Sequence, residues 1–183
     1  MRPLLQFEGV TLCRGGRQLF ENLDLELGPG EALQVVGPNG SGKSSLLRLA
    51  AGLLQPERGS IDRSRIALAD DNVALDRELT LKRALAFWGG DSDRAMDLLG
   101  VAPLAEVPVR LLSSGQLKRA TLARVAASGA PLWLLDEPFN ALDADGTKRL
   151  ATLIEQHRAS GGAVLVASHL PLPGEWPQLE LAQ

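Results

Sequence analysis

The residues best suited to chemistry lie at positions 35–45, where the sequence reads VVGPNGSGKSS. Glycine, four residues of any type and then Gly-Lys-Ser form a phosphate-binding loop, or P-loop. Its glycines let the backbone turn tightly, so that successive N–H groups and the positive end of the next helix face one anion. Lys43 supplies a charge for the outer phosphates, and Ser44 supplies a hydroxyl for Mg²⁺. The residues expected to contact the phosphates are Gly37, Pro38, Asn39, Gly40, Ser41, Gly42, Lys43, Ser44 and Ser45.

Two carboxylates, Asp136 and Glu137, follow an apolar run at residues 132–135. Such a run is typical of a central parallel strand, whose end would place both carboxylates at the edge of the sheet. Asp136 is then suited to hold the magnesium shell, directly or through water, and Glu137 to accept a proton from an attacking water. An acidic pair at a strand end is often only solvated surface, but the P-loop upstream favours the catalytic interpretation.

The elements around these residues alternate between strands and helices. An apolar run at residues 32–36 precedes the P-loop, and helical spacing begins after it. Downstream, a helix at 144–158 follows Glu137, and a strand at 163–167 leads to His169. This order predicts an α/β fold with a mainly parallel sheet. Ligands bind such sheets beyond the carboxyl ends of the strands, where the P-loop, the carboxylate pair and His169 would meet.

A pair of antiparallel β-strands is expected before the P-loop. Apolar residues recur along segments 4–12 and 19–27, and the turn signal Arg14-Gly15-Gly16-Arg17 lies between them. Short strands are also expected after the P-loop helix, near residues 60–62 and 65–69.

Residues 80–127 change to helical spacing, with turns at Gly89-Gly90 and Val107-Pro108. We therefore expect a helical insert between two halves of the α/β core. Leu81, Leu85 and Trp88 share one helical face in it, and such a face is more often core than a ligand site.

The composition indicates one soluble globular domain. The chain has 183 residues, of which 45% are hydrophobic and 22% charged, and a formal net charge of -3, so nucleic acid is not an expected partner. Cys13 is the single cysteine, which excludes an internal disulfide and a cysteine metal cluster, and we expect it to be buried. No stretch reaches the ~20 apolar residues of a membrane span, and the N-terminus lacks the pattern of a signal peptide. Work at a membrane would need a partner chain.

The sequence resembles the ATP-binding-cassette (ABC) ATPases from end to end. Leu112-Ser113-Ser114-Gly115-Gln116 is similar to their Leu-Ser-Gly-Gly-Gln signature, Ala141-Leu142-Asp143 to the loop after their catalytic glutamate, and His169 to their switch histidine. The resemblance implies a P-loop NTPase fold of ABC type: residues 1–183 form one domain, with a core at 1–72 and 128–183 and a helical signature subdomain at 73–127.

The same resemblance implies a head-to-tail dimer with Mg²⁺ and ATP held between the P-loop of one copy and the signature of the other. It assigns catalytic roles to Glu137 and His169. It adds nucleotide contacts from Ser113, Ser114, Gly115, Gln116 and Asp143.

Three positions depart from the family pattern. Ser114 stands where the first signature glycine is usual, so a Cβ lies where the backbone approaches phosphate. Asn72 stands in place of a glutamine that senses magnesium, and we expect it to take that role. Arg14 stands in place of an aromatic ring that stacks on adenine, and a planar guanidinium can also stack on a base.

Within the family, the chain is similar to the haem exporter ATP-binding subunit of bacterial cytochrome c maturation. The similar segments are residues 14–20, 37–48, 78–80 and 87–88. This resemblance implies a peripheral subunit on the cytoplasmic face of the bacterial inner membrane, bound to integral membrane subunits, whose ATP cycle powers release of a haem-loaded carrier protein. Alternatives are the ATPase subunit of another small exporter and a nucleotide-binding regulatory subunit without hydrolysis. A soluble cassette ATPase that acts on DNA or ribosomes is disfavoured by the acidic charge.

Overall fold

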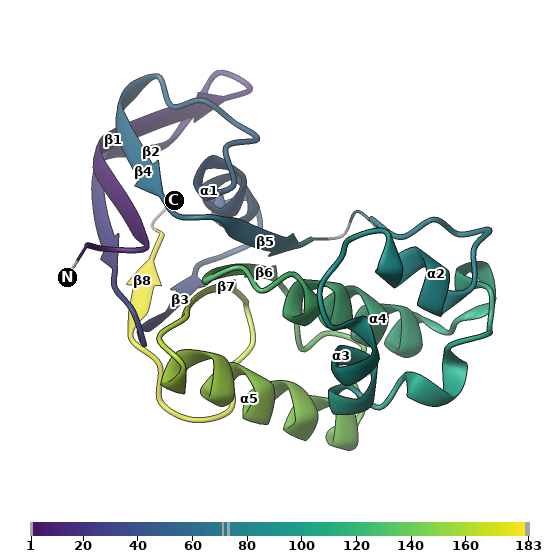
Figure 1. Cartoon of the computed structure of the whole chain (residues 1–183). Helices are drawn as coiled ribbons and strands as arrows, with labels where there is room; N and C mark the ends of the chain where they lie inside the picture. The colour runs from purple at the N-terminus through teal and green to yellow at the C-terminus, as the bar shows by residue number, and fades with distance from the viewer. Residues whose placement is uncertain (1, 71, 73, 182–183) are drawn as a thin grey trace.

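The computed structural model describes residues 2–70, 72 and 74–181. Its centre is a five-stranded parallel sheet with the order β5-β6-β7-β3-β8 (Figure 1). The strands are β3 (Ala32–Val36), β5 (Ile66–Ala69), β6 (Leu132–Asp136), β7 (Ala163–Ala167) and β8 (Gln178–Glu180). Every residue of β6 and β7 is buried, as expected for central strands that are covered on both faces.

The second sheet is antiparallel and has the order β2-β1-β4. Its strands are β1 (Leu5–Arg14), β2 (Arg17–Leu27) and β4 (Arg58–Arg63). Gly15 and Gly16 join β1 to β2 with φ angles of 58° and 74°. A two-residue hairpin turn of this kind needs positive φ at both positions, which glycine adopts without strain.

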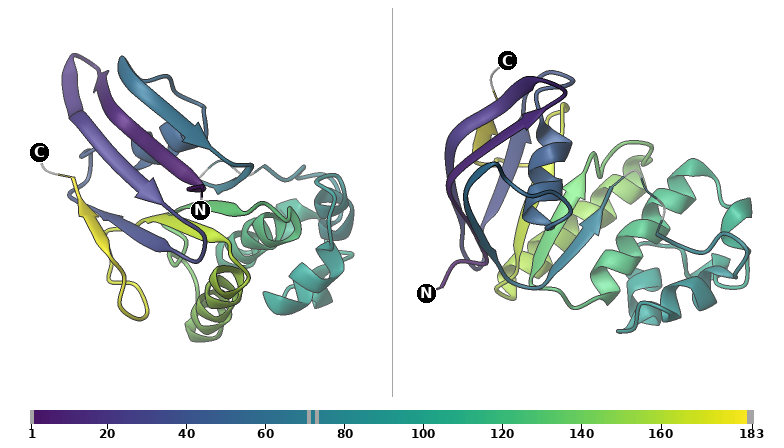
Figure 2. Two further views of the ribbon diagram at one scale, coloured as in Figure 1. Left: turned by 60° about the vertical axis from the view of Figure 1, so that its left-hand side comes forward. Right: turned by 90° about the horizontal axis from the view of Figure 1, so that it is seen from above.

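Helix α1 (Lys43–Ala50) lies between the two sheets (Figures 1 and 2). Its buried residues, such as Leu46 and Leu49, pack in one cluster with Leu12 of β1 and with Leu134 and Leu165 of the parallel sheet. The alternate residues of β6 and β7 point to the opposite face, where they pack with the other helices. The parallel sheet therefore has a helical layer on each side.

The opposite layer contains α4 (Ser114–Ala127) and α5 (Ala144–Ala159), which lie below the sheet in Figure 1. Between β5 and α4 the chain forms α2 (Leu81–Ala86), α3 (Ser92–Leu98) and the 3-10 turns η1 (Ala102–Leu104) and η2 (Val109–Leu111). Figure 1 shows α2 and α3 beside α4, at the β5 side of the molecule. Among the described residues, no helix is both long enough and apolar enough to cross a bilayer.

The structure confirms the α/β class, with a parallel core, an antiparallel N-terminal piece and inserted helices. Three details differ. Strand β8 was not predicted, because three residues at an edge give too short a pattern. Trp88 is 42% exposed rather than part of the core, because α2 ends at Ala86 and the helical spacing stops with it. Cys13 is half-buried, because it alternates with buried Leu12 and points to the other face of β1.

Candidate functional site

A cleft of about 540 Å³ opens at the carboxyl ends of β3 and β6. This is where a parallel sheet places its ligand sites. The cleft therefore brings the P-loop and the carboxylate pair of Asp136 and Glu137 together, as the sequence predicted. Its walls are formed by Arg14, Gly15, Leu19, Asn39, Gly40, Gly42, Lys43, Ser44, Ser45, Asp136 and Glu137.

The P-loop turns tightly over the start of α1. Gly40 and Gly42 have φ angles of 82° and 103°, a region that other residues rarely adopt. A Cβ on Gly37 would lie 2.7 Å from the hydroxyl oxygen of Ser41, so the cradle also needs glycine for space. Ser41 Oγ is buried and has no hydrogen-bond partner among the described residues. The loop thus has the open backbone and the polar lining that a phosphate group requires.

The ammonium group of Lys43 is held at the loop, where it donates to the backbone oxygens of Gly37 at 2.7 Å and Pro38 at 3.0 Å. The residue is only 8% exposed. A phosphate in the cradle would offer this buried cation a stronger, charged acceptor than two neutral carbonyls. The chemistry of the loop therefore fits a nucleoside triphosphate as substrate.

Arg14 lines the cleft at the end of β1, and its Nη1 donates to Ser45 Oγ at 3.4 Å. The structure thus brings the predicted base-stacking residue to the cleft. Leu19 also lines the cleft and was not predicted, because an apolar residue at the start of a strand carries no signal of its own. Leu19 and Phe20 lie 3.3 Å from the position of a Cβ on Gly42, so β2 also restricts that position to glycine.

Asp136 ends β6 and is 7% exposed, within reach of the cleft. Its backbone oxygen accepts a hydrogen bond of 3.1 Å from Nζ of Lys118 on α4. This contact, which the sequence did not predict, links the helix that follows the signature to the strand end that carries the carboxylates.

Glu137 adopts an unusual backbone conformation with φ 45°. Its N–H donates to the oxygen of Ala167 at the end of β7, 2.8 Å away. Oε1 lies 2.8 Å from Nδ1 of His169 and accepts the backbone N–H of the same residue at 3.2 Å. Oε2 is buried and has no partner among the described residues. One carboxylate oxygen is therefore held in place while the other can accept a proton.

The signature residues lie at the start of α4 and do not line the cleft. Ser113 caps the helix: its Oγ accepts the N–H of Gln116 at 3.3 Å, and the Gln116 side chain accepts the Ser113 N–H at 2.9 Å. Ser114 is the first helical residue and does not have a positive φ, so a side chain causes no backbone strain there. Gly115 is restricted, since a Cβ would lie 2.8 Å from the oxygen of Ala141.

Asp143 and Asn72 also lie outside the walls of the cleft. Asp143 caps α5, and its Oδ1 accepts the N–H of Gly146 at 2.7 Å. Asn72 is exposed, and its backbone and side-chain N–H groups both donate to the carboxylate of Asp70, at 3.1 and 3.0 Å. In one copy of the chain, the structure therefore does not bring these two residues to the P-loop.

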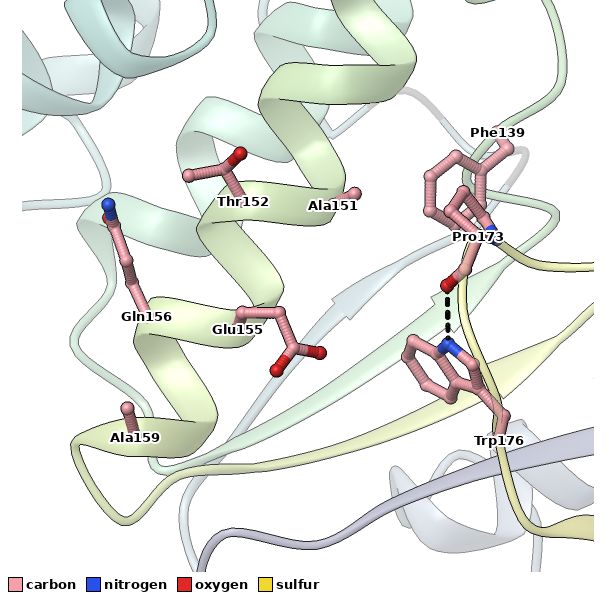
Figure 3. Close-up of a pocket in the computed structure, with 8 residues that line it drawn as sticks. All are labelled: Phe139, Ala151, Thr152, Glu155, Gln156, Ala159, Pro173 and Trp176. Atoms are coloured by element: carbon pink, nitrogen blue, oxygen red, sulfur yellow. Dashed lines mark hydrogen bonds between the residues drawn. The ribbon is translucent and has the colours of Figure 1, made fainter.

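Another groove of equal volume, about 540 Å³, lies between α5 and the segment after His169 (Figure 3). Its walls are mainly apolar and include Phe139, Pro173 and Trp176, whose Nε1 donates to the oxygen of Pro173 at 3.0 Å. Volume alone does not separate the two cavities. Of these two cavities, the cleft at the strand ends is the one that combines a lysine, glycine-rich backbone and two carboxylates among the described residues, so it is the candidate site.

Comparisons with known proteins agree with this geometry. The model of a family described as ABC transporter matches residues 20–140. The chain is 56% identical over 180 residues to the "Cytochrome c biogenesis ATP-binding export protein CcmA" of Sphingopyxis alaskensis, an alignment that covers 94% of this chain and 93% of that protein. It is 53% identical to the protein of the same name from Novosphingobium aromaticivorans, with 89% and 87% covered.

Solved structures show the same fold. An "ATP binding subunit of ABC transporter" superposes with a TM-score of 0.84 at 22% identity, covering 91% of this chain and 80% of that one. A "putative metal-chelate type ABC transporter" in an inward-facing conformation superposes with a TM-score of 0.77 at 27% identity, covering 93% and 75%. The chain therefore belongs to the ABC transporter family as an ATP-binding, ATP-hydrolysing subunit, within the group of the cytochrome c biogenesis ATP-binding export proteins.

Proposed function

We propose that this chain hydrolyses ATP for a membrane complex of bacterial cytochrome c maturation, and that its ATP cycle drives release of a haem-loaded carrier protein. The observation that supports this role is the similarity, along almost the whole chain, to proteins named for cytochrome c biogenesis and export. The cleft supports the chemistry, because Lys43, Asp136 and Glu137 face one space in which a triphosphate fits.

The P-loop residues 37–45, with the ammonium group of Lys43 among them, would hold the phosphates of ATP. Ser44 and Asp136 would hold Mg²⁺, which supplies charge neutralisation across the outer phosphate oxygens when it is bound. Arg14 would lie against the base, where its planar guanidinium can stack.

Glu137 would act as the general base through Oε2, the carboxylate oxygen without a partner among the described residues. A buried acceptor of this kind is suited to take a proton from the water that attacks the γ-phosphate. His169 would keep Oε1 in place, so that Oε2, which has no partner among the described residues, is left as the proton acceptor. In this mechanism, catalysis depends on two residues that follow neighbouring strands, Glu137 after β6 and His169 after β7.

The site would be completed by a second copy of the chain in a head-to-tail dimer. At the start of α4, Ser113 and Ser114 are exposed and Gly115 and Gln116 are half-buried, and all four lie outside the cleft of their own copy. Their location favours contact with the nucleotide held by the other copy, where the helix N-terminus would attract a phosphate. Asp143 would lie at the same dimer contact.

The membrane subunits would dock on the helical insert at residues 73–127, which we propose as a subdomain beside the core at 1–72 and 128–183; Val73 lies outside the described residues. Phe87 is 81% exposed and Trp88 is 42% exposed, although both are large and apolar. Their ring centroids lie 5.7 Å apart with the planes nearly perpendicular, so they form one aromatic surface. Exposed aromatic clusters of this kind are typical of interfaces. Docking there would place the chain on the cytoplasmic face of the inner membrane.

The test is to replace this chain in cells by the Glu137→Gln variant and to measure haem bound to the periplasmic carrier together with mature cytochrome c. Because loading of the carrier needs no hydrolysis and release does, we expect haem-bound carrier to accumulate and mature cytochrome c to disappear. A Glu26→Gln variant, altered at an exposed carboxylate of β2 outside the cleft and the insert, serves as the control and should behave like the parent. Abundant cytochrome c, or a carrier without haem, in cells with the Glu137→Gln chain would contradict the proposed role.

A further inference from the structure

Gln34 is a buried polar residue in the middle of β3, the strand that leads into the P-loop. It is 2% exposed and does not line the cleft, and its neighbours Leu33 and Val35 are apolar. A strand with another strand on each side and covered faces is usually apolar throughout, as β7 is. A buried amide costs free energy unless its polar atoms are hydrogen-bonded, so the partners of Gln34 indicate why an amide stands there.

The amide of Gln34 joins two segments that lie far from it in the sequence. Its Nε2 donates to the backbone oxygen of Leu170 at 3.0 Å, and its Oε1 accepts from Nε2 of Gln178 in β8 at 3.1 Å. Because a carbonyl oxygen can only accept, the contact with Leu170 determines which end of the amide faces that residue. The donor end of Gln34 is therefore directed to the residue that follows His169.

The backbone on each side of His169 is tied to β3. Before it, the N–H of Ser168 donates to the oxygen of Val35 at 3.2 Å. After it, the oxygen of Leu170 accepts the Gln34 amide and, at 3.1 Å, the hydroxyl of Ser168. Residues 168–170 are thus held by hydrogen bonds to the strand that carries the P-loop.

These ties matter because the side chain of His169 is 47% exposed, so surrounding atoms do little to fix it. His169 contacts Oε1 of Glu137 twice, through its backbone N–H at 3.2 Å and through Nδ1 at 2.8 Å. Both contacts depend on the position of the backbone at residues 168–170. A shift of that backbone would lengthen both contacts together, and small misplacements of a catalytic group slow a reaction.

We propose that Gln34 is a positioning residue for ATP hydrolysis, which holds the oxygen of Leu170 and thereby keeps His169 in contact with Glu137. Gln34 acts only through the backbone of residues 168–170. The inference rests on the proposed roles of Glu137 as the general base and of His169 as its partner. It requires neither the haem carrier nor a membrane subunit.

Gln34→Met is the first test, because methionine has nearly the length of glutamine but no N–H donor. We expect single-turnover hydrolysis of ATP to be roughly three- to tenfold slower, since the segment loses one hydrogen bond and keeps the others. The dissociation constant for ATP, measured by equilibrium dialysis, should stay within twofold of that of the parent. A substitution that merely disturbed the strand before the P-loop would weaken ATP binding instead.

Gln178→Met is the matched control. It removes the donor to Oε1 of Gln34 at the exposed edge of the sheet but leaves the bond from Gln34 to Leu170 in place. We expect this variant to hydrolyse ATP within twofold of the parent. An equal loss of rate in Gln34→Met and Gln178→Met would assign the effect to the packing of β8 and overturn the inference.

Gln34→Glu adds a pH readout that packing alone would not change. A neutral carboxyl group can donate to the Leu170 oxygen and still accept from Gln178, whereas a carboxylate can only accept and would repel that oxygen. Burial raises the pKa of a carboxyl group, so its neutral fraction grows as the pH is lowered. Strand β7 has no titratable residue, and in β8 the titratable residue is Glu180, which pairs with Val36.

We therefore expect the rate of the Gln34→Glu chain, divided by the rate of the parent at the same pH, to rise as the pH falls from about 8 to about 6. Division by the rate of the parent removes every other titration of the active site. The same ratio for Gln34→Met should not change with pH. A ratio for Gln34→Glu that is equal at both ends of the range would overturn the inference, as would a Gln34→Met chain slowed by less than threefold.

The double variant with Glu137→Gln separates this inference from the proposed function. If Gln34 acts by positioning the partner of Glu137, Gln34→Met should slow the Glu137→Gln chain no further. A Glu137→Gln chain that hydrolyses ATP as fast as the parent would contradict the proposed base itself. A slow Glu137→Gln chain combined with an undiminished Gln34→Met chain would contradict only the positioning role of Gln34.

Discussion

Nδ1 of His169 lies 2.8 Å from Oε1 of Glu137, and the backbone N–H of His169 donates to the same oxygen. The two residues follow neighbouring strands, and the pairing of Asp136 with Ala167 fixes the relative positions of those strand ends. The sheet therefore fixes the backbone hydrogen bond to this oxygen, while the imidazole that makes the second contact is 47% exposed. The contributions of the Glu137 and His169 side chains to the rate of ATP hydrolysis can be measured separately by substitution.

Replacing Glu137 with Gln should lower the rate of ATP hydrolysis by ~10² to 10⁴, the usual effect of losing a general base. The amide keeps the shape of the carboxylate but cannot accept the proton, so the dissociation constant for ATP should stay close to that of the parent. Single-turnover hydrolysis and nucleotide binding are the measurements. Hydrolysis within threefold of the parent would rule out Glu137 as the base.

Replacing His169 with Ala should lower the rate by a smaller factor, roughly 10- to 100-fold, since a hydrogen bond to a charged group contributes about 1.5–3 kcal/mol. Oε1 of Glu137 would lose the ring but keep the backbone N–H of residue 169. Steady-state kinetics of His169→Ala and of the double variant with Glu137→Gln distinguish the two roles. If His169 acts by positioning Glu137, the double variant should be no slower than Glu137→Gln alone.

A Lys43→Ala chain and a Ser113→Arg chain should each be weak ATPases as homodimers. In the proposed dimer the two residues of a site come from different copies, so a mixed dimer should hold one site with both defects and one with neither. Some activity should therefore return, measured after size-exclusion purification of the mixed dimer. Mixed dimers that form but recover no activity would count against a shared site.

The free energy of unfolding should fall as the pH is lowered from about 7.5 through 6.5, the ordinary pKa of histidine. Burial lowers the pKa of His157, so the unfolded chain binds a proton more readily than the folded one over this range. The stability contributed by neutral His157 is thus complete above the unfolded pKa and lost as the pH decreases towards the folded value.

The His157→Phe variant checks the source of this pH dependence. The ring of His157 stacks on Trp133 with centroids 3.8 Å apart, and phenylalanine can retain the stack without titrating. Denaturant unfolding at both ends of the pH range should therefore show a weaker dependence in the variant. An unchanged slope would assign the effect to other groups.

The sequence predicted the elements that carry chemistry because their signals are local. The P-loop has fixed spacing, and the strand before Asp136 is a continuous apolar run whose every residue is buried in the structure. Strand β8 gave no such signal, since its three residues form a strand only because β3 offers an open edge.

Long-range contacts account for what could not be predicted in the site. The approach of Lys118 to the Asp136 oxygen depends on how α4 packs on the sheet, which no short pattern encodes. Asn72 was expected at the metal, yet in the structure its side chain binds Asp70, a neighbour two residues away. In the proposed dimer, the positions of the signature residues relative to the P-loop would depend on a second copy of the chain, which one sequence indicates only through family resemblance.

The last prediction concerns the aromatic surface of the insert. Phe87→Ser should weaken co-purification of the membrane subunits while leaving ATP hydrolysis by the isolated chain unchanged, because Phe87 is 81% exposed and lies outside the cleft. Leu53→Ser is the matched control, since Leu53 is a 62% exposed apolar residue in the turn between α1 and β4, outside the insert. Pull-down from detergent-solubilised membranes should retain the subunits with Leu53→Ser and lose them with Phe87→Ser. A docked aromatic ring that is replaced by the small polar side chain of serine loses both its apolar area and its shape, so binding at this surface should weaken. Equal recovery with both variants would therefore mean that the membrane partner binds another face.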